Sequence, residues 1–340
     1  MSTAATCTRH LLLLLFLSSL LVHPSSSKEE NCNKDDRRVL MKIKKDLDIP
    51  WTTSVECCEW GGVSCDSDVH PHRVTGIAFQ YFFQRYPNSP SHFPEAIGDL
   101  PYLTEIYFRK QSNFSGSIPS SIAKLKYLTA LDISWINLTG NIPDFFGQLK
   151  SLTYLRLSFN KLTGPIPSWL SQIPNLSFID LSRNMLTGTI PASLGNLKAN
   201  DQFQLYLSHN QLSGHVPDSF SGFNFFEIDL SRNMLQGDLS MLFGHNKTVL
   251  TMDVSRNMFE FDMSKLQLPK SLTHFDISHN KIYGSIPRAT IDLELQFFNV
   301  SYNRLCGKIP QGGNLQTGFD YSAFFHNLCL CGAPLNVTCK

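Results

Sequence analysis

The residues most able to do chemistry in this chain are aspartates that recur at a regular interval. Asp229, Asp253 and Asp276 are separated by 24 and 23 residues, and Asp132 and Asp180 belong to the same series. If the interval places them on neighbouring strands, their carboxylates fall about 5–9 Å apart, the separation that the paired acids of a glycosidase require. A binding surface and a solvated face are the alternatives. The elements that position these aspartates decide between the three hypotheses.

Eight of the nine cysteines lie in two groups near the ends of the chain. Four fall in Cys32–Cys65 and four in Cys306–Cys339, and the 240 residues between the groups contain none. Each group allows three pairings, and strain disfavours only a bond between the adjacent Cys57 and Cys58, so sequential and nested pairings both remain open. Neither group has histidines at the spacing of zinc ligands. We therefore expect disulfides, no metal and no cofactor.

The first 27 residues have the features of a secretory signal peptide. Arg9 precedes an apolar run from Leu11 to Val22, and Pro24 and three serines follow, which predicts cleavage near Ser27. A membrane-spanning helix needs about 20 apolar residues, more than this run or any later stretch supplies. We therefore expect a secreted chain without a membrane span, whose thiols can pair in an oxidising compartment.

The charge is balanced and the composition is that of a folded protein. Twenty-nine Lys and Arg stand against 28 Asp and Glu, a net charge of +1, whereas a nucleic-acid-binding domain carries a basic face. Apolar residues make up 42% of the chain, which is ample core material. Nucleic acid is therefore not an expected partner.

Six Asn-x-Ser/Thr triplets are candidate glycan acceptors, in agreement with a secreted chain. The triplet also arises by chance where Asn, Ser and Thr recur, so we expect several of the six to be occupied rather than all. The acceptors are Asn113, Asn137, Asn175, Asn246, Asn299 and Asn336.

The middle of the chain consists of near-copies of one segment. "YLRLSFNKLTGPIP" from Tyr154, "FIDLSRNMLTGTIP" from Phe178 and "HFDISHNKIYGSIP" from His274 share one pattern of Leu or Ile, Asn, Gly and Pro. A period of 20–29 residues with this pattern indicates a leucine-rich repeat. We count ten repeats between Val74 and Pro310, of which the first three are the least regular. The repeated asparagines are Asn160, Asn184, Asn210, Asn233, Asn257, Asn280 and Asn303.

The repeat has a physical cause that predicts the fold. In L-x-L both apolar side chains point inward from a short strand, and the Asn amide bonds peptide groups left unpaired at the following turn. One coil cannot bury its apolar side alone, so successive coils stack. We predict an α/β solenoid: a curved leucine-rich-repeat superhelix with a parallel concave β-sheet and disulfide-bonded caps. The expected segments are a signal peptide at 1–27, an N-terminal cap at 28–73, repeats at 74–310 and, with Cys306, a C-terminal cap at 311–340.

Outward-facing columns of the concave sheet are the candidate binding surface. An acidic column lies beside one of cations and aromatics, and exposed aromatics favour a protein interface over a solvated face in which Asp and Arg neutralise each other. We expect His274 and His279 to gain positive charge as the pH falls from about 7 to 5. The candidate partner-binding residues are Asp132, Trp135, Tyr154, Arg156, Phe159, Phe178, Asp180, Arg183, Gln204, Tyr206, His209, Glu227, Asp229, Arg232, Asp253, Arg256, His274 and Asp276.

The same columns argue against an enzyme. An open sheet has no cleft that would raise the pKa of one carboxyl group, and neighbouring arginines would keep the aspartates ionised. Every mature cysteine has a plausible disulfide partner, so no thiol nucleophile is expected.

The caps and the irregular repeats resemble the plant polygalacturonase-inhibiting proteins. The similar segments are "CCEWGGVSC" from Cys57, "LSRNMLQGDLSMLFG" from Leu230, "YNRLCGKIPQGGNLQ" from Tyr302 and "CLCGAPL" from Cys329. The resemblance covers nearly the whole mature chain. It implies the disulfides Cys32–Cys57, Cys58–Cys65, Cys306–Cys329 and Cys331–Cys339.

This resemblance implies a protein secreted to the plant cell wall, or apoplast, that limits pectin degradation in plant defence. Its partner would be a fungal or insect endopolygalacturonase bound on the concave face, with pectin as a second candidate ligand. Arg156 and Ser182 depart from the family's pattern, which leaves the target enzyme open. The alternative is a secreted leucine-rich-repeat receptor partner that binds a peptide or another receptor ectodomain.

Overall fold

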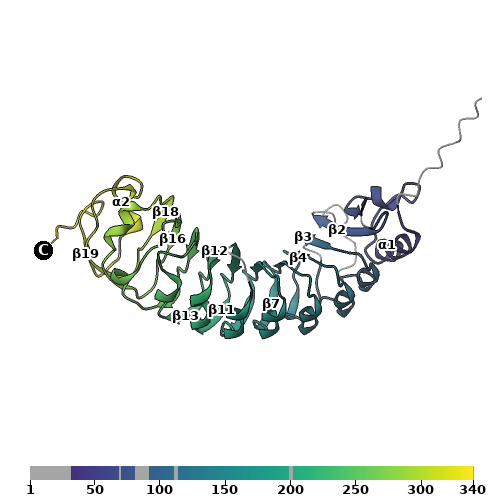
Figure 1. Ribbon diagram of the computed structural model, residues 1–340, viewed down its shortest axis with the longest axis horizontal. Coiled ribbons are helices and arrows are strands. Elements are labelled where there is room, and N and C mark those ends of the chain that lie inside the picture. Colours follow the sequence, from purple (N-terminus) through teal and green to yellow (C-terminus); the bar gives the residue numbers. More distant parts are fainter. Residues whose placement is uncertain (1–31, 69, 81–91, 111–113, 199–201, 340) are drawn as a thin grey trace, which may run out of the picture.

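The computed structural model describes residues 32–68, 70–80, 92–110, 114–198 and 202–339, and it shows a curved stack of coils (Figure 1). The predicted signal peptide and the sequon at Asn113 lie outside the described residues. The predicted solenoid is confirmed: strands line the inner side of the arc and short helices its outer side.

The concave face is an 11-stranded sheet in which each coil contributes one strand. Ten strands are parallel, as predicted, and the first strand, from the N-terminal cap, pairs antiparallel with the second. The strands in order are β1 (Val63–Cys65), β2 (Val74–Gln80), β3 (Glu105–Arg109), β4 (Ala130–Ser134), β6 (Tyr154–Arg156), β8 (Phe178–Asp180), β10 (Phe203–Tyr206), β12 (Phe225–Asp229), β14 (Thr251–Asp253), β16 (His274–Asp276) and β18 (Phe297–Asn299).

A second series of parallel strands follows the repeated asparagines, and we did not predict it. It is built from the segment around the repeat's Gly, which has positive φ in most coils. One sheet comprises β5 (Thr139–Asn141), β7 (Lys161–Pro165), β9 (Met185–Gly188), β11 (Gln211–His215), β13 (Met234–Gly237) and β15 (Met258–Phe259). The other comprises β17 (Tyr283–Gly284), β19 (Arg304–Lys308) and β20 (Cys329–Cys331).

Short 3₁₀ helices form the convex side. Most begin directly after the Pro of the repeat, whose fixed φ suits the residue before a helix. The 3₁₀ helices are η1 (Cys57–Glu59), η3 (Glu95–Asp99), η4 (Ser120–Lys124), η5 (Asp144–Gln148), η6 (Ser168–Gln172), η7 (Ala192–Asn196), η8 (Asp218–Gly222), η9 (Ser240–Leu242), η10 (Met263–Lys265), η11 (Arg288–Asp292) and η12 (Tyr321–Ala323). The α-helices are α1 (Lys34–Asp46) and α2 (Asn314–Thr317) in the caps.

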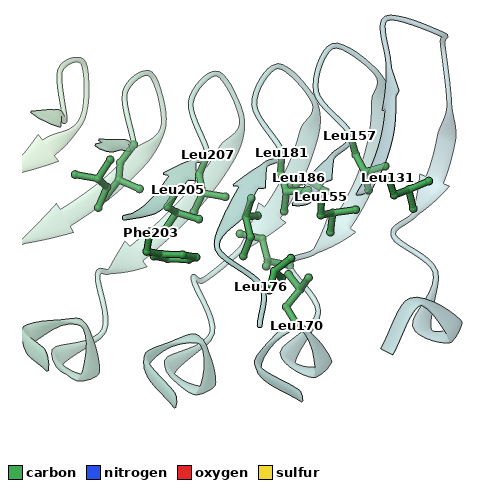
Figure 2. Packing of buried hydrophobic residues seen from close by; sticks show 14 of the residues in the cluster. Leu131, Leu155, Leu157, Leu170, Leu176, Leu181, Leu186, Phe203, Leu205 and Leu207 are labelled. Atoms are coloured by element: carbon green, nitrogen blue, oxygen red, sulfur yellow. The ribbon is translucent and has the colours of Figure 1, made fainter. Parts of the chain in front are cut away.

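The core is one continuous column of apolar side chains between the sheet and the helices. Figure 2 shows equivalent leucines of adjacent coils, such as Leu157, Leu181 and Leu207, stacked one behind another. These three side chains are fully buried. Each coil is therefore stabilised mainly by its neighbours, as the repeat pattern predicts.

The repeated asparagines join adjacent coils. Asn184 Oδ1 accepts a hydrogen bond from Leu162 N at 3.0 Å, and its Nδ2 donates to Leu157 O at 3.0 Å, both in the preceding coil. The predicted role of the asparagine is confirmed. The series extends into the C-terminal cap with Asn327, which we did not predict, although it follows Asn303 by 24 residues.

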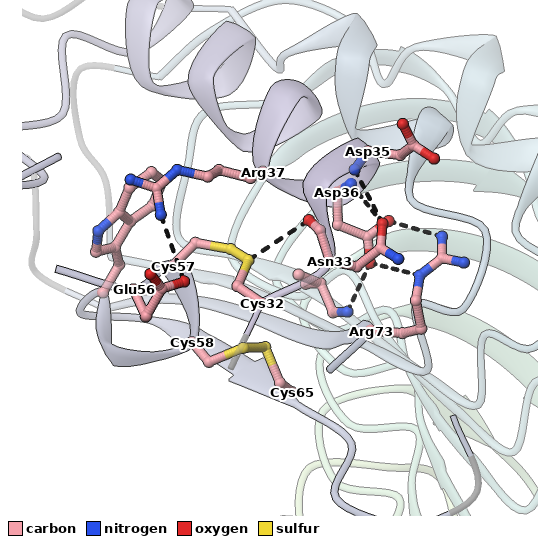
Figure 3. The surroundings of a disulfide bond; sticks show 12 residues. Cys32, Asn33, Asp35, Asp36, Arg37, Glu56, Cys57, Cys58, Cys65 and Arg73 are labelled. Atoms are coloured by element: carbon pink, nitrogen blue, oxygen red, sulfur yellow. Dashed lines mark hydrogen bonds and ion pairs between the residues drawn. A yellow bond between two sulfur atoms is a disulfide. The ribbon is translucent and has the colours of Figure 1, made fainter. Parts of the chain in front are cut away.

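The N-terminal cap is attached to the first strand by a buried ion pair (Figure 3). Asp36 on α1 is 1% exposed and accepts hydrogen bonds from Arg73 Nη2 at 2.7 Å and from Val74 N at 2.8 Å. Asn33 caps the helix by accepting from Asp35 N at 2.9 Å. The cap therefore covers the open end of the stack at the point where β2 begins.

Four disulfides close the two caps, and their pairs are those that the family resemblance implies. The sulfur atoms of Cys32, Cys57 and Cys58 lie within 4.8 Å of one another. All three cysteines are disulfide-bonded, which leaves no thiolate among them to bind a metal ion.

Removing the long disulfide of the C-terminal cap should destabilise the last coils. The Cys306–Cys329 bond spans 23 residues, and a loop of this size contributes about 3 kcal/mol through chain entropy. We expect Cys306→Ser/Cys329→Ser to lower the melting temperature and to increase hydrogen exchange first in β18 and β19. Exchange that increases first in the central coils would contradict this prediction.

Candidate protein-binding surface

The strand register places all eighteen predicted binding residues in three adjacent columns. The column at the strand starts holds Tyr154, Phe178, Gln204, Glu227 and His274. The central column holds Asp132, Arg156, Asp180, Tyr206, Asp229, Asp253 and Asp276. The third column, at the turn after each strand, holds Trp135, Phe159, Arg183, His209, Arg232 and Arg256.

The aspartates of the central column differ in exposure, whereas we predicted that all would face outward. Asp132 is 0% exposed and is paired with Arg109 Nε at 2.7 Å, and Asp180 is 5% exposed and paired with Arg156 Nε at 2.9 Å. An arginine on the preceding strand replaces water around each carboxylate. These two aspartates are therefore parts of buried ion pairs rather than free binding groups.

The acidic stripe, defined as Asp229, Asp253 and Asp276, occupies directly paired positions on β12, β14 and β16. Neighbouring parallel strands lie about 4.8 Å apart, so the three carboxylates follow one another closely. All three side chains are half-buried. The predicted stripe is confirmed as an arrangement.

Each carboxylate of the stripe also stabilises the turn that follows its strand. Asp229 Oδ1 accepts from Ser231 N at 3.0 Å and from Ser231 Oγ at 2.7 Å. Asn299, in the same column, accepts the equivalent bonds from Ser301 N at 3.1 Å and Ser301 Oγ at 2.7 Å. An amide therefore does this structural work as well as a carboxylate does.

The charge of the stripe depends on pH, and the responsible group is an aspartate. Burial and the neighbouring carboxylates of Asp229 and Asp276 raise the pKa of Asp253 to about 6. Burial also raises the pKa of Asp132, although Ser134 and Arg109 oppose the shift. The prediction that no carboxyl pKa would be raised on this open face is therefore wrong.

The predicted gain of charge at His279 moves to lower pH. Burial and the nearby Arg256 guanidinium lower the pKa of His279, so its ring stays neutral further into the acidic range. Burial together with Arg183 and Arg232 lowers the pKa of His209 in the same way. Asp253 is a further group of this face that changes charge near pH 6.

The turn column has a left-handed backbone in every described coil from β3 onward. φ lies between 54° and 61° at these positions, a region that aromatic residues and arginine seldom adopt. The residue types at these positions gave no signal of this conformation. The left-handed residues are Lys110, Trp135, Phe159, Arg183, His209, Arg232, Arg256, His279, Tyr302 and His326.

Aromatic rings stack along two of the columns. Trp135 and Phe159 stack with ring centroids 3.6 Å apart, and the Arg183 guanidinium lies 4.9 Å from the centre of the Phe159 ring. Tyr154 and Phe178 stack at 4.2 Å in the strand-start column. Trp135 is 45% exposed, so the N-terminal half of the face presents flat apolar surface.

A shallow depression of about 430 Å³ lies between the aromatic and acidic parts of the face. Both positions that depart from the family pattern line it, and Arg156 holds its pair with Asp180 there. The Tyr206 hydroxyl, at one side, donates to the Glu227 carboxylate and lies 3.0 Å from Gln204 Oε1. Burial and Glu227 raise the pKa of Tyr206 above its ordinary value, so this hydroxyl remains a donor. The lining residues are Tyr154, Arg156, Phe178, Asp180, Ser182 and Tyr206.

The candidate glycan acceptors differ in accessibility. Asn175, Asn246 and Asn336 are exposed, whereas Asn137 and Asn299 are half-buried. Ser301, the hydroxyl residue of the Asn299 sequon, is buried. The three exposed acceptors are the sites where a glycan fits the folded chain best.

Sequence comparisons agree with this architecture. Models described as "Leucine rich repeat" match residues 126–186, 204–223 and 271–293, and one described as "Leucine rich repeat N-terminal domain" matches residues 33–66. Polygalacturonase inhibitor 2 of Arabidopsis thaliana is 49% identical over 96% of this chain and 98% of its own length. The polygalacturonase inhibitor of Vitis vinifera is 51% identical, with 96% of each chain covered.

This chain belongs to the polygalacturonase-inhibitor family. A solved plant ice-binding protein is 44% identical to this family member, with a TM-score of 0.86 over 91% of this chain and 99% of that chain. Within its described residues, the family member has no helix long and apolar enough to cross a membrane.

The left-handed backbone can be tested at Arg232. Glycine adopts positive φ without strain, whereas the branched side chain of valine makes it costly. We expect Arg232→Val to lower the free energy of unfolding by about 1–2 kcal/mol relative to Arg232→Gly, although both remove the same charge. Urea denaturation measures the difference. Equal stability of the two variants would contradict the assigned conformation.

The raised pKa of Asp253 should make stability depend on pH. Its pKa is about 6 in the folded chain and 3.8 in the free residue, so folding favours the protonated form. This contribution is complete below about pH 4 and is lost as the pH rises through 6. The change also creates an Asn-x-Ser triplet with Ser255, so both proteins are made in a host without N-glycosylation. We expect Asp253→Asn to melt higher than the parent at pH 7 and at the same temperature at pH 4.

Thermal unfolding between pH 4 and pH 7 checks this expectation. Asp218→Asn, at an exposed position on the convex helix η8, is the matched control and should leave the pH dependence unchanged. An Asp253→Asn variant that melts below the parent at pH 7 would show that the carboxylate stabilises the fold.

Proposed function

We propose that this protein binds and inhibits an endopolygalacturonase through its concave face in the plant apoplast. The observation that carries the proposal is the 49–51% identity, over nearly the whole length of both chains, to proteins named polygalacturonase inhibitors. The ice-binding relative is less similar, at 44%. The uncovered concave face supplies the surface that such binding needs.

The geometry divides the face into two parts with different roles. The stacked rings of Trp135 and Phe159 offer rigid apolar area, which contributes most to the lifetime of a complex. The acidic stripe at the other end would attract Lys and Arg of the enzyme and accelerate association. The buried pairs of Asp132 and Asp180 hold the sheet between these parts and contribute shape rather than free charge.

Catalysis by this chain is not part of the proposal. A raised carboxyl pKa such as that of Asp253 is one feature of an acid catalyst. However, Asp229 and Asp276 lie in the same row as Asp253, on the neighbouring strands of an open sheet. Carboxylates in one row do not flank a substrate bond from opposite sides, as the acids of a glycosidase do. The proposed role of the stripe is therefore electrostatic.

An inhibition panel tests the proposal directly. The purified protein is mixed with fungal and insect endopolygalacturonases, and the release of reducing ends from polygalacturonate is followed. Inhibition of at least one enzyme is the expected result. Release of reducing ends by the protein alone would identify an enzyme. Cosedimentation with polygalacturonate tests pectin as a second ligand, and the absence of any inhibition would favour a receptor partner.

The stripe should control the association rate in a pH-dependent way. At pH 7 Asp253 is ionised, so Asp253→Asn removes one negative charge and should slow association with an inhibited enzyme several-fold. At pH 5 the parent carboxyl is already largely protonated, and the variant should associate at nearly the parental rate. Stopped-flow or surface-binding kinetics at both pH values measure the two rates, with Asp218→Asn as the control. An equal effect at both pH values would exclude this role.

A further inference from the structure

Three coils carry the same Arg-Asn-Met sequence, at 183–185, 232–234 and 256–258. In each, the asparagine takes part in the hydrogen bonds between coils, and the residues on either side of it are exposed. The methionines Met185, Met234 and Met258 are 40%, 47% and 37% exposed. Together the exposed residues form what we term the Arg–Met rim: Arg183, Met185, Arg232, Met234, Arg256 and Met258.

The rim lies along the edge of the concave face. Its arginines belong to the left-handed turn column, and its methionines are the first residues of β9, β13 and β15 in the second sheet. The rim therefore extends the candidate binding surface beyond the concave strands and onto the side of the solenoid. None of its residues is among the Leu and Ile positions that form the core.

The fold does not require methionine at these positions. Lys161 and Gln211 occupy the equivalent place in neighbouring coils, at the starts of β7 and β11, and both are exposed. Polar residues therefore suffice at these solvent-exposed positions. The presence of three large apolar side chains there indicates a contact outside the chain. Methionine suits such a contact because its flexible side chain adapts to an irregular partner surface.

The arginines indicate the charge of that partner. In the part of the chain that the structure describes, neither Arg232 nor Arg256 forms an ion pair with a carboxylate, although the acidic stripe is in the same coils. Their guanidinium groups remain available, and arginine binds carboxylates in a bidentate geometry. A partner segment with carboxylates beside apolar side chains complements the rim.

We propose that the Arg–Met rim is a second contact strip for the polygalacturonase, and that it binds a loop carrying acidic and apolar side chains. The inference rests on the proposed function, because the occupant is assigned to the enzyme held by the concave face. Continuity of the rim with that face supports this occupant. The apolar contact slows dissociation, and the arginines orient the loop during association.

The test replaces the methionines with the residue that the chain itself uses at the equivalent position. Met185→Gln/Met234→Gln/Met258→Gln follows the precedent of Gln211 and should leave the melting temperature unchanged. Met41→Gln on α1 is the matched control, since Met41 is also exposed, at 38%, but lies in the N-terminal cap. Binding kinetics are measured against a polygalacturonase that the parent inhibits.

We expect the triple variant to bind about tenfold more weakly, through faster dissociation, and the control to bind as the parent does. Arg232→Asn/Arg256→Asn, which keeps a residue tolerant of the left-handed backbone, should slow association and reduce its salt dependence. The contrary result is a triple variant that keeps the parental affinity while Asp253→Asn still slows association at pH 7. It would overturn the proposed role of the rim and leave the proposed function unaffected.

Two further outcomes are distinguishable. A parent that binds no polygalacturonase overturns both proposals, and this is seen before any variant is made. In the other outcome, sedimentation shows that the parent is a dimer and the triple variant a monomer, while both bind the enzyme equally well. This result would assign the rim to self-association and overturn the proposed occupant.

Discussion

Each coil leaves backbone groups unpaired at the turn after its concave strand, and the buried asparagine of the next coil supplies their partners. Asn184 shows the pattern, with its oxygen and nitrogen both bonded to the preceding coil. Because an unpaired buried peptide group costs about 1–3 kcal/mol, every turn depends on the coil that follows it. The stack can therefore be ordered only as a whole, and its last turn is completed by Asn327 in the cap.

The same constraint shapes the binding surface. At the turn after each concave strand, the chain takes a left-handed conformation one residue before the position of the repeat's asparagine. That turn holds Trp135 and Phe159 in a face-to-face stack and places Arg232 and Arg256 in adjacent coils. The side chains of the surface can thus vary from coil to coil, whereas their positions are set by the backbone.

Electrostatics along the sheet follow from the same regular spacing. Identical register places carboxylates of adjacent coils side by side, which is unfavourable unless a cation or a proton separates them. Arginines on the preceding strands compensate Asp132 and Asp180, and these carboxylates become buried. In the acidic stripe, where no such arginine intervenes, the pKa of Asp253 rises to about 6 instead.

The sequence alone determined the solenoid, the core positions, the asparagine series and the three surface columns. Each of these features depends on a residue pattern that is complete within one coil. Because the pattern recurs about every 24 residues, the same features are expected in all of the coils. The family resemblance of the caps also predicted the disulfide pairs, whereas the spacing of the cysteines alone left more than one pairing open in each cap.

Only the tertiary structure decided the left-handed turns, the second sheet, the burial of Asp132 and the pKa of Asp253. Each of these is set by a residue in the adjacent coil: Arg109 reaches Asp132 across 23 positions of sequence, and Asp229 and Asp276 approach Asp253 from either side. Residue types within one coil carry no information about such a neighbour, because its effect depends on which side chains the register places at hydrogen-bonding distance.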